Sequence, residues 1–191
     1  MDIDIWWGLV ERARRAAGDR ADDRDLPDDP LPDILTGLLY ELGAAQIIDF
    51  DRILVEVMDT AYRYPLWNAA YLIEGGCGDD GFMDFRAGLV LQGRAVFTQA
   101  VADPDSLAGL PVVARMGRDE GGWIGCEGMN YVAVNAYERL RGERESFDAA
   151  MEAALRGMDR PARAAGESWD PEDEDECRRR LPRLSALFLD S

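Results

Sequence analysis

The sequence predicts an all-α protein with one compact domain over residues 1–191, built from about seven to eight helices. Apolar side chains recur every three or four residues through most of the chain, which is the spacing of one helix face. The segments with this spacing end at glycine or proline, the usual helix stops. Hydrophobic residues make up 47% of the chain, enough for a packed core.

The first helix is expected to end at Gly18 and to dock its tryptophans into the core. Its apolar face consists of Ile3, Trp6, Trp7, Val10 and Ala13. Residues 19–33 follow as a solvated linker, because this segment holds seven aspartates and three prolines. A short amphipathic helix should then cover residues 34–42, with Asp33 as its N-cap and Gly43 as its end.

The central part of the chain carries the strongest helical pattern. Apolar residues keep the helical period from about residue 44 to Arg63. Pro65 occupies a position at which proline begins a helix, and the next stop is Gly75. A further stripe runs over residues 82–101 and is interrupted near Gly93. The pattern therefore predicts consecutive helices joined by short glycine turns.

The C-terminal part is less regular. Residues 109–125 are glycine-rich, with room for a brief strand at 110–113. Two further helices are expected over residues 129–141 and 147–158. Residues 159–191 are expected to form an acidic tail that packs back on the body.

Within the tail, Asp170 is expected to cap a helix that has Pro171 in its first position. Acidic residues at 172–176 precede arginines at 178–180, the order that the helix dipole favours. The residues that should form a hydrophobic clasp against the body are Pro182, Leu184, Leu187 and Phe188.

The charge of the chain is one-sided. Asp and Glu number 38 against 21 basic residues, for a net charge of −17, and every basic residue is arginine. Such a charge repels nucleic acid and anionic membranes, so direct binding to either is not expected. Arginine in place of lysine is typical of a GC-rich, actinobacterial-type genome, and acidity by itself serves solubility.

The lack of lysine and histidine excludes several kinds of active site. Without lysine there is no P-loop, no kinase-type lysine and no Schiff base. Without histidine there is no Ser-His-Asp or Cys-His machinery and no HExxH zinc site. Catalysis would rest on carboxylates, cysteines or an oxygen-ligated Mg²⁺ or Ca²⁺. The composition therefore favours a protein that is not an enzyme and has no cofactor.

The N-terminus and the cysteines indicate a cytoplasmic protein. The first residues have neither a basic region nor an apolar run, so they do not resemble a signal peptide. No apolar run reaches the ~18 residues that a membrane span needs. Cys77, Cys126 and Cys177 are odd in number and widely scattered, which fits reduced thiols better than disulfides or a zinc site.

The loop at residues 76–81, Gly-Cys-Gly-Asp-Asp-Gly, formally matches the pattern GxGxxG. A dinucleotide-binding loop must follow a β-strand, whereas residues 67–74 are expected to be helical. Two aspartates in the loop would also repel a phosphate group. We therefore expect no nucleotide site here.

The acidic residues around this loop admit two interpretations. In the first, Asp79 and Asp80 cap the following helix, Asp84 adds charge to its first turn, and one of the two loop aspartates pairs with a partly buried Arg86. In the second, Asp79, Asp80 and Asp84 hold Mg²⁺ or Ca²⁺ together with Glu74. The spacing of an EF-hand is missing, which favours the structural interpretation.

Two neighbouring features are weighed in the same way. Cys77 lies at a helix start, but it has no histidine partner and adjoins two aspartates, so a structural role is favoured over a nucleophile. The segments 120–123 and 126–127 could rim a pocket, with Trp123 either facing a ligand or inserted into the core.

The two acidic runs, at residues 19–33 and 170–176, could bind a basic protein surface or mimic a nucleic-acid backbone. A mimic needs its acids on one ordered face, and charge runs are most often simply solvated.

Several motifs stand out when they are taken together. They are the aromatic helix at Trp6-Trp7-Gly8-Leu9-Val10, the segment from Trp67 to Ile73, the core Gly75-Gly76-Cys77-Gly78-Asp79-Asp80-Gly81-Phe82-Met83-Asp84-Phe85-Arg86, the stretch from Asp103 to Leu107, and Pro182-Arg183-Leu184. With these motifs the sequence resembles a bacterial family of unknown function, DUF4240. The resemblance spans nearly the whole chain and implies a helical, cytosolic bacterial protein without an established activity.

The chain departs from the family pattern at two glycines. Gly78 stands where the family usually has serine, which removes a hydroxyl cap. Gly88 stands where a tryptophan is common, which we expect to open a void or a small pocket.

We therefore expect an acidic interaction or regulatory module whose partner is a protein with a basic surface. The alternative is an enzyme or a protein that binds a small ligand or divalent cation through the region from Gly75 to Arg86. The candidate residues, for ligand binding or for structure, are Trp67, Glu74, Cys77, Asp79, Asp80, Phe82, Asp84, Arg86 and Trp123.

Overall fold

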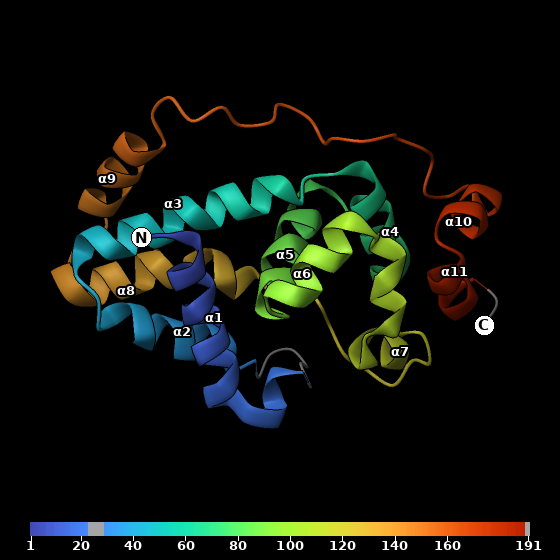
Figure 1. Ribbon diagram of the computed structural model, residues 1–191, viewed down its shortest axis with the longest axis horizontal. Helices are drawn as coiled ribbons and strands as arrows, with labels where there is room; N and C mark the ends of the chain where they lie inside the picture. Colours follow the sequence, from blue (N-terminus) through green and yellow to red (C-terminus); the bar gives the residue numbers. More distant parts are fainter. Residues whose placement is uncertain (23–28, 190–191) are drawn as a thin grey trace.

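The computed structural model describes residues 1–22 and 29–189 and shows a helical protein (Figure 1). Its α-helices are α1 (Ile3–Ala17), α2 (Leu31–Tyr40), α3 (Ala44–Thr60), α4 (Tyr64–Glu74), α5 (Asp79–Leu91), α6 (Arg94–Ala102), α7 (Pro111–Met116), α8 (Val132–Arg141), α9 (Glu145–Leu155), α10 (Glu174–Arg180) and α11 (Pro182–Phe188). The 3-10 helices are η1 (Gly18–Ala21), η2 (Pro104–Gly109) and η3 (Glu127–Tyr131). No strand is present among the described residues, so the predicted all-α class is confirmed.

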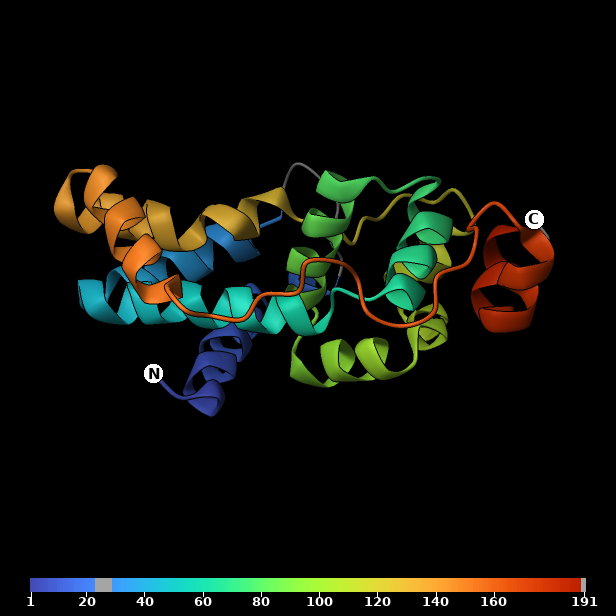
Figure 2. The same ribbon diagram turned by 90° about the horizontal axis from the view of Figure 1, so that it is seen from above.

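The helices form an elongated body with α5 between its two ends (Figure 1). At one end, α2 packs against α1 and α8, and α3 packs against α8 and α9. At the other end, α11 packs against α4 and η2, and α7 also contacts η2. Both views show the segment between α9 and α10 crossing the molecule as an extended chain (Figures 1 and 2).

The tryptophans of α1 lie in the core, as predicted. Trp6 is fully buried, stacks on Phe50 of α3 with ring centroids 5.2 Å apart, and donates a hydrogen bond from Nε1 to the Phe50 carbonyl at 3.0 Å. Trp7 is 6% exposed and contacts the ring of Phe97. The hydrogen bond satisfies the buried indole N–H of Trp6, and the rings of both tryptophans supply apolar surface to the core.

The linker predicted at residues 19–33 is wrong at both ends, and residues 23–28 lie outside the described part. Its start forms η1. Its end belongs to α2, because Leu31 is fully buried and draws the helix start toward the core. Asp33 is therefore not the N-cap; instead Asp29 Oδ1 accepts a hydrogen bond from the Leu31 amide at 2.9 Å. Gly43 precedes α3 instead of ending α2.

Two further local predictions are corrected. The brief strand at 110–113 is helix α7, because Pro111 begins a helical turn and Val112 and Val113 are both buried on one side of it. The cap predicted at Asp170 is supplied by Asp173, whose carboxylate accepts hydrogen bonds from the amides of residues 175 and 176. In both cases tertiary burial and the local cap decide the helix start, and isolated propensity does not.

The last helix is held by a buried carboxylate. Asp105, in η2, is 6% exposed and accepts hydrogen bonds from the amides of Arg183 and Leu184 at 3.0–3.2 Å. The Arg183 side chain adds a bond to the same carboxylate at 3.1 Å. Leu184 and Ser185 are buried behind this contact.

Candidate functional site

A glycine on α5 allows another segment to cross this helix closely. A Cβ added to Gly88 would lie 1.8 Å from the Ile124 carbonyl oxygen and 2.9 Å from the Cys126 amide nitrogen. The Cys126 amide in turn donates a hydrogen bond to the Asp84 carbonyl at 2.8 Å. The prediction of a void at Gly88 is therefore wrong, because the main chain of Ile124 fills that space.

This crossing builds one wall of a cavity of about 570 Å³. The other walls come from the start of α2, the end of α4 and the first turns of α5. The lining residues are Asp29, Pro32, Asp33, Glu74, Gly81, Asp84, Trp123, Gly125, Cys126, Glu127 and Gly128. Five of them are carboxylic acids, and none of the described lining residues is basic. The cavity is thus strongly acidic.

Among the acids that line this cavity, Glu74 has the most strongly shifted pKa. Burial raises the pKa of its carboxyl group to about 7, and the nearby charge of Asp84 adds to the rise. The nearby Gly125 amide and Cys77 thiol oppose the rise. One carboxylate oxygen, Oε1, is buried and has no hydrogen-bond partner within the described part of the chain. Because an unpaired buried carboxylate is costly, this oxygen is a ready acceptor.

Asp84, on α5, lines the same cavity as Glu74, and its pKa is also shifted. Burial raises the pKa of Asp84, and the charge of Glu127 adds to the rise. The side-chain amide of Asn130 donates to Asp84 Oδ1 at 2.9 Å and opposes it. Asp84 and Glu74 therefore both carry a cost when ionised at neutral pH.

Asp79 and Asp80 do not take the places predicted for them. Both are exposed in the first turn of α5, Gly78 is the N-cap, and no side chain caps this helix. Their charges still favour the positive end of the helix dipole. Neither lines the acidic cavity.

Arg86 also has a different partner from the one predicted. Its guanidinium lies over the rings of Tyr62 and Phe82, 4.8 and 5.0 Å from their centroids, and donates to the Met58 carbonyl at 3.0 Å. Burial lowers the pKa of Arg86. Within residues 1–22 and 29–189 it forms no ion pair, so aromatic faces and main-chain carbonyls replace the expected aspartate.

Trp67 and Phe82 form a stacked pair behind the loop. Their ring centroids are 4.8 Å apart, and Trp67 Nε1 donates to the Cys77 carbonyl at 2.8 Å. Burial, reinforced by the charge of Glu74, raises the pKa of the Cys77 thiol to about 12. Cys77 is therefore a thiol at neutral pH, and the pair of rings fixes the loop that carries it.

The pocket rim predicted from the glycine-rich segment is only partly as expected. Trp123 and Glu127 line the cavity, whereas Glu120 pairs with Arg118 outside it. The sequence offers no local signal for Gly125 or Asn130, because their roles depend on contacts with residues more than 40 positions away.

Most acids of the run at 170–176 have partners within the chain. Glu172 accepts from the Tyr71 hydroxyl, Asp173 caps α10, and Glu174 and Glu176 pair with arginines of the same helix. These acids are therefore poorly placed to bind a basic partner. In the other acidic run, residues 23–28 lie outside the part of the chain that the structure describes.

Three further observations bear on the class of site. The loop at 76–81 joins two helices, so the strand that a dinucleotide motif requires is missing, as expected. No group of three or more Cys, Asp and Glu side chains in the described residues is arranged to hold a metal ion. None of the described helices is long and apolar enough to cross a membrane.

Comparisons with known proteins place the chain in a family. A search of curated proteins and a search of solved structures both return no match. A family model described as a protein of unknown function, DUF4240, matches residues 1–139. The match stops before α9, so it covers less of the chain than the expected resemblance, which extends to Leu184. It includes every residue that lines the acidic cavity. The chain therefore belongs to the DUF4240 family.

Proposed function

We propose that this protein is an interaction module that receives a positively charged group of a protein partner in the acidic cavity. The observation that carries the proposal is the unpartnered, buried Oε1 of Glu74 in a cavity that five carboxylic acids line without a basic residue among those described. A cation would supply the missing partner and offset the cost of ionising Glu74.

The size and the lining of the site suit a ligand group that carries positive charge. A cavity of about 570 Å³ lies within the usual range for ligand sites of roughly 300–1,000 Å³. Trp123 adds an aromatic face, which attracts a guanidinium or ammonium group. Arginine, with five donors in a planar fork, can satisfy more than one carboxylate at once.

The arrangement of charge favours a macromolecular source of the cation. Asp33 and Glu127 are exposed at the rim, and Glu74 lies deeper. Together with a net charge of −17, rim carboxylates steer a basic surface toward the cavity and set its orientation. A free organic cation shares the same chemistry, and the experiment below separates the two sources.

The test compares two double variants that each replace two carboxylic acids by amides. Glu74→Gln/Asp84→Asn removes two acids from the cavity, and Asp79→Asn/Asp80→Asn removes two exposed acids outside it. Calorimetry with an arginine-containing tetrapeptide should show binding to the wild type. We expect at least about a tenfold loss in the cavity variant and less than about a twofold loss in the control.

Separate titrations identify the source of the cation. Binding of the tetrapeptide but not of acetyl-arginine amide or spermidine supports a protein partner, whereas equal binding of the small cations supports a small ligand. An equal loss in both double variants would overturn the proposal, because it would show only the general field of the protein. Mg²⁺ and Ca²⁺ serve as charge controls, and a stabilisation seen with them alone would also contradict it.

A further inference from the structure

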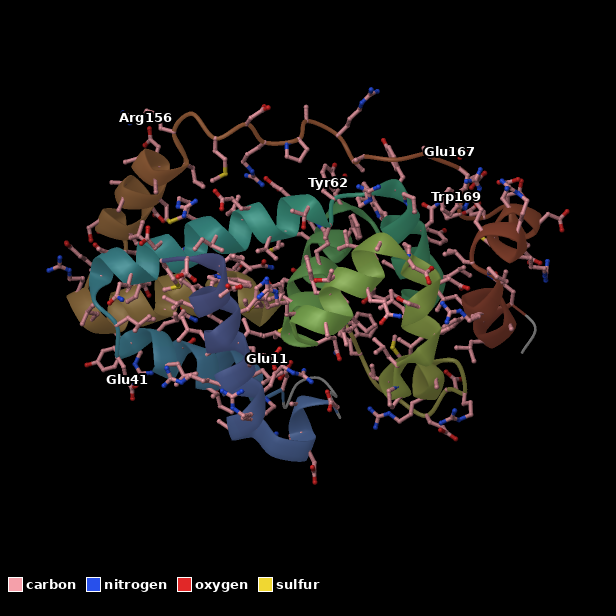
Figure 3. The ribbon with its side chains drawn as sticks, viewed as in Figure 1. Glu11, Glu41, Tyr62, Arg156, Glu167 and Trp169 are labelled. Carbon is pink, nitrogen blue, oxygen red and sulfur yellow. The ribbon has the colours of Figure 1, made fainter. Side chains whose placement is uncertain are left out.

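A second surface, separate from the acidic cavity, is covered by the C-terminal part of the chain. Residues 156–173 join α9 to α10 and lie outside the part that matches the family model. Figure 3 shows this strap running from Arg156 past Glu167 to Trp169 along one side of the molecule. Ala164, which is 4% exposed, is its one buried residue, and most of the others are exposed. The strap thus resembles a peptide laid on the surface of the body.

The main chain of the strap pairs with the junction of α3 and α4. The Ala165 amide donates to the Tyr62 carbonyl at 2.9 Å, and the Tyr64 amide donates to the Ala165 carbonyl at 2.8 Å. These bonds form an isolated parallel bridge opposite Arg63. The side-chain amide of Asn68 then donates to the Trp169 carbonyl at 3.0 Å. Main-chain hydrogen bonds of this kind also hold an extended peptide when it binds at the edge of a sheet.

Side chains give the same groove two specific contacts. Arg160 makes a two-pronged ion pair with Asp59, with distances of 2.9 and 3.0 Å, and the Asp59 side chain is only 14% exposed. Nine positions later, Trp169 lies beside a cavity of about 250 Å³ that Tyr64, Trp67 and Tyr71 also line, and the Arg180 guanidinium of α10 lies 4.7 Å from the centroid of its ring. The groove therefore contacts a basic residue at one end and an aromatic residue at the other.

Arg86 lies behind this groove and limits the cost of opening it. Its guanidinium stacks on Tyr62 and donates to the carbonyl of Met58, the residue before Asp59. The nearby charge of Asp59 raises the pKa of Arg86, and the charge of Arg160 lowers it. When Arg160 leaves, Asp59 therefore still faces a cation in the body.

We infer that the groove over the α3–α4 junction binds an extended peptide with an arginine for Asp59 and an aromatic residue about nine positions later, and that the strap is its built-in occupant. The Asp59–Arg160 ion pair is the latch. α9 and α10 anchor the two ends of the strap, so it opens locally while the helical body stays folded.

The first test measures amide hydrogen exchange in the full chain. The strap amides, including that of Ala165, should exchange faster than those of α3 and α8. Arg160→Gln should raise strap exchange about threefold to tenfold, the range expected for a two-pronged, partly exposed ion pair. Arg163→Gln removes an exposed arginine from the same strap that has no ion pair among the described residues, and it should change exchange by less than about twofold.

The second test adds a labelled peptide of residues 158–173 to the full-length protein. Because the strap competes with it, the peptide should bind Arg160→Gln more tightly than the wild type, by the same factor as the rise in exchange. A peptide with Trp169→Ala should lose most of this binding. The inference is overturned if the strap exchanges only as fast as α3, or if the peptide binds neither protein. It is equally overturned if Arg160→Gln forms dimers that exclude the peptide, since the strap would then be exchanged between copies.

Discussion

Two helices of this protein, α5 and α10, begin with acidic residues, yet their acids end in opposite environments. In α10, Asp173 caps the helix, and Glu174 and Glu176 pair with arginines one turn later. In α5, the N-cap is Gly78, no side chain caps the helix, and the one arginine on it faces aromatic rings. The acids near α5 are therefore left without a cationic partner in the described structure.

The pKa values of two glutamates express this difference. Hydrogen bonds from Arg179 and Arg180 lower the pKa of Glu176 to about 2. Burial raises the pKa of Glu74, at the end of α4, to about 7. Acidic composition by itself is thus a poor guide to the state of an acid, because the arginines of α10 neutralise one acidic region, whereas burial raises the pKa values in the other.

The largest effect should come from breaking the wall of the cavity. Gly88→Ala places a Cβ within 1.8 Å of a main-chain oxygen, so α5 and the crossing segment must separate. We expect a loss of about 3 kcal/mol or more in the free energy of unfolding. Gly8→Ala in α1 is the control, because nothing lies within 4 Å of its added Cβ. It should gain about 0.5–1 kcal/mol. Urea unfolding of both variants measures the difference, and equal stability would contradict the close crossing.

The next effect has opposite signs in the two regions. Between pH 4.5 and 7, folded Glu74 keeps a proton that the unfolded chain has lost, so its contribution to stability falls as pH rises through this window. Glu74→Gln should therefore be more stable than the wild type at pH 8, by at most about 3 kcal/mol, and equal to it near pH 4. Such a gain in stability with a loss of binding is typical of a functional residue.

Glu176→Gln provides the matched change in the tail. The lowered pKa of Glu176 means that its contribution is present above pH 4.5 and is lost as pH falls toward 2. This variant should be less stable than the wild type at pH 8. Denaturant midpoints at pH 4, 6 and 8 compare the two substitutions, and a shift of the same sign at pH 8 would remove the contrast.

A third way to satisfy an acid is found at η2, where peptide N–H groups replace arginine. Asp105→Ala removes the acceptor of two main-chain amides, one of them buried, and of the Arg183 side chain, so we expect a loss of about 2–3 kcal/mol. Asp103→Ala removes an acid that is 59% exposed and pairs with the same arginine, and it should cost less than about 1 kcal/mol. Thermal unfolding should separate the two variants by several degrees, and coincident midpoints would count against a role for the buried amides.

Local sequence patterns predicted the helices but not their contacts. The periodic stripes place α1, α3, α4 and α8, and Gly75 and Gly142 end two of these helices in the left-handed conformation. The same patterns fail at α7, where two valines suggest a strand while proline and burial impose a helical turn.

The candidate site is harder to predict because it is made by distant segments. Glu74 and Asp84 are visible in the loop motif, but the wall that faces them comes from residues 123–128. Their meeting depends on the missing side chain of Gly88, which no periodicity reveals. Arg86 illustrates the same limit: its partners are two rings and the main-chain carbonyls of Met58 and Phe82, and the nearest aspartates in sequence are not among them.

The smallest expected effect concerns the two helix starts themselves. Gly78 has an extended backbone, and a Cβ added there would have nothing within 4 Å, so serine fits the N-cap of α5 without strain. Gly78→Ser supplies the missing side-chain acceptor and restricts the unfolded chain, and together these should add about 0.5–1 kcal/mol. Asp173→Ala removes the existing cap of α10 and should cost about 1 kcal/mol. Combining Gly78→Ser with Glu74→Gln sharpens the comparison further, because the serine should give the same gain at pH 4 and pH 8, whereas the glutamine should give its gain only at the higher pH. If the serine gain also grew with pH, the cap and the acidic cavity would be coupled, and the helix start would belong to the binding site.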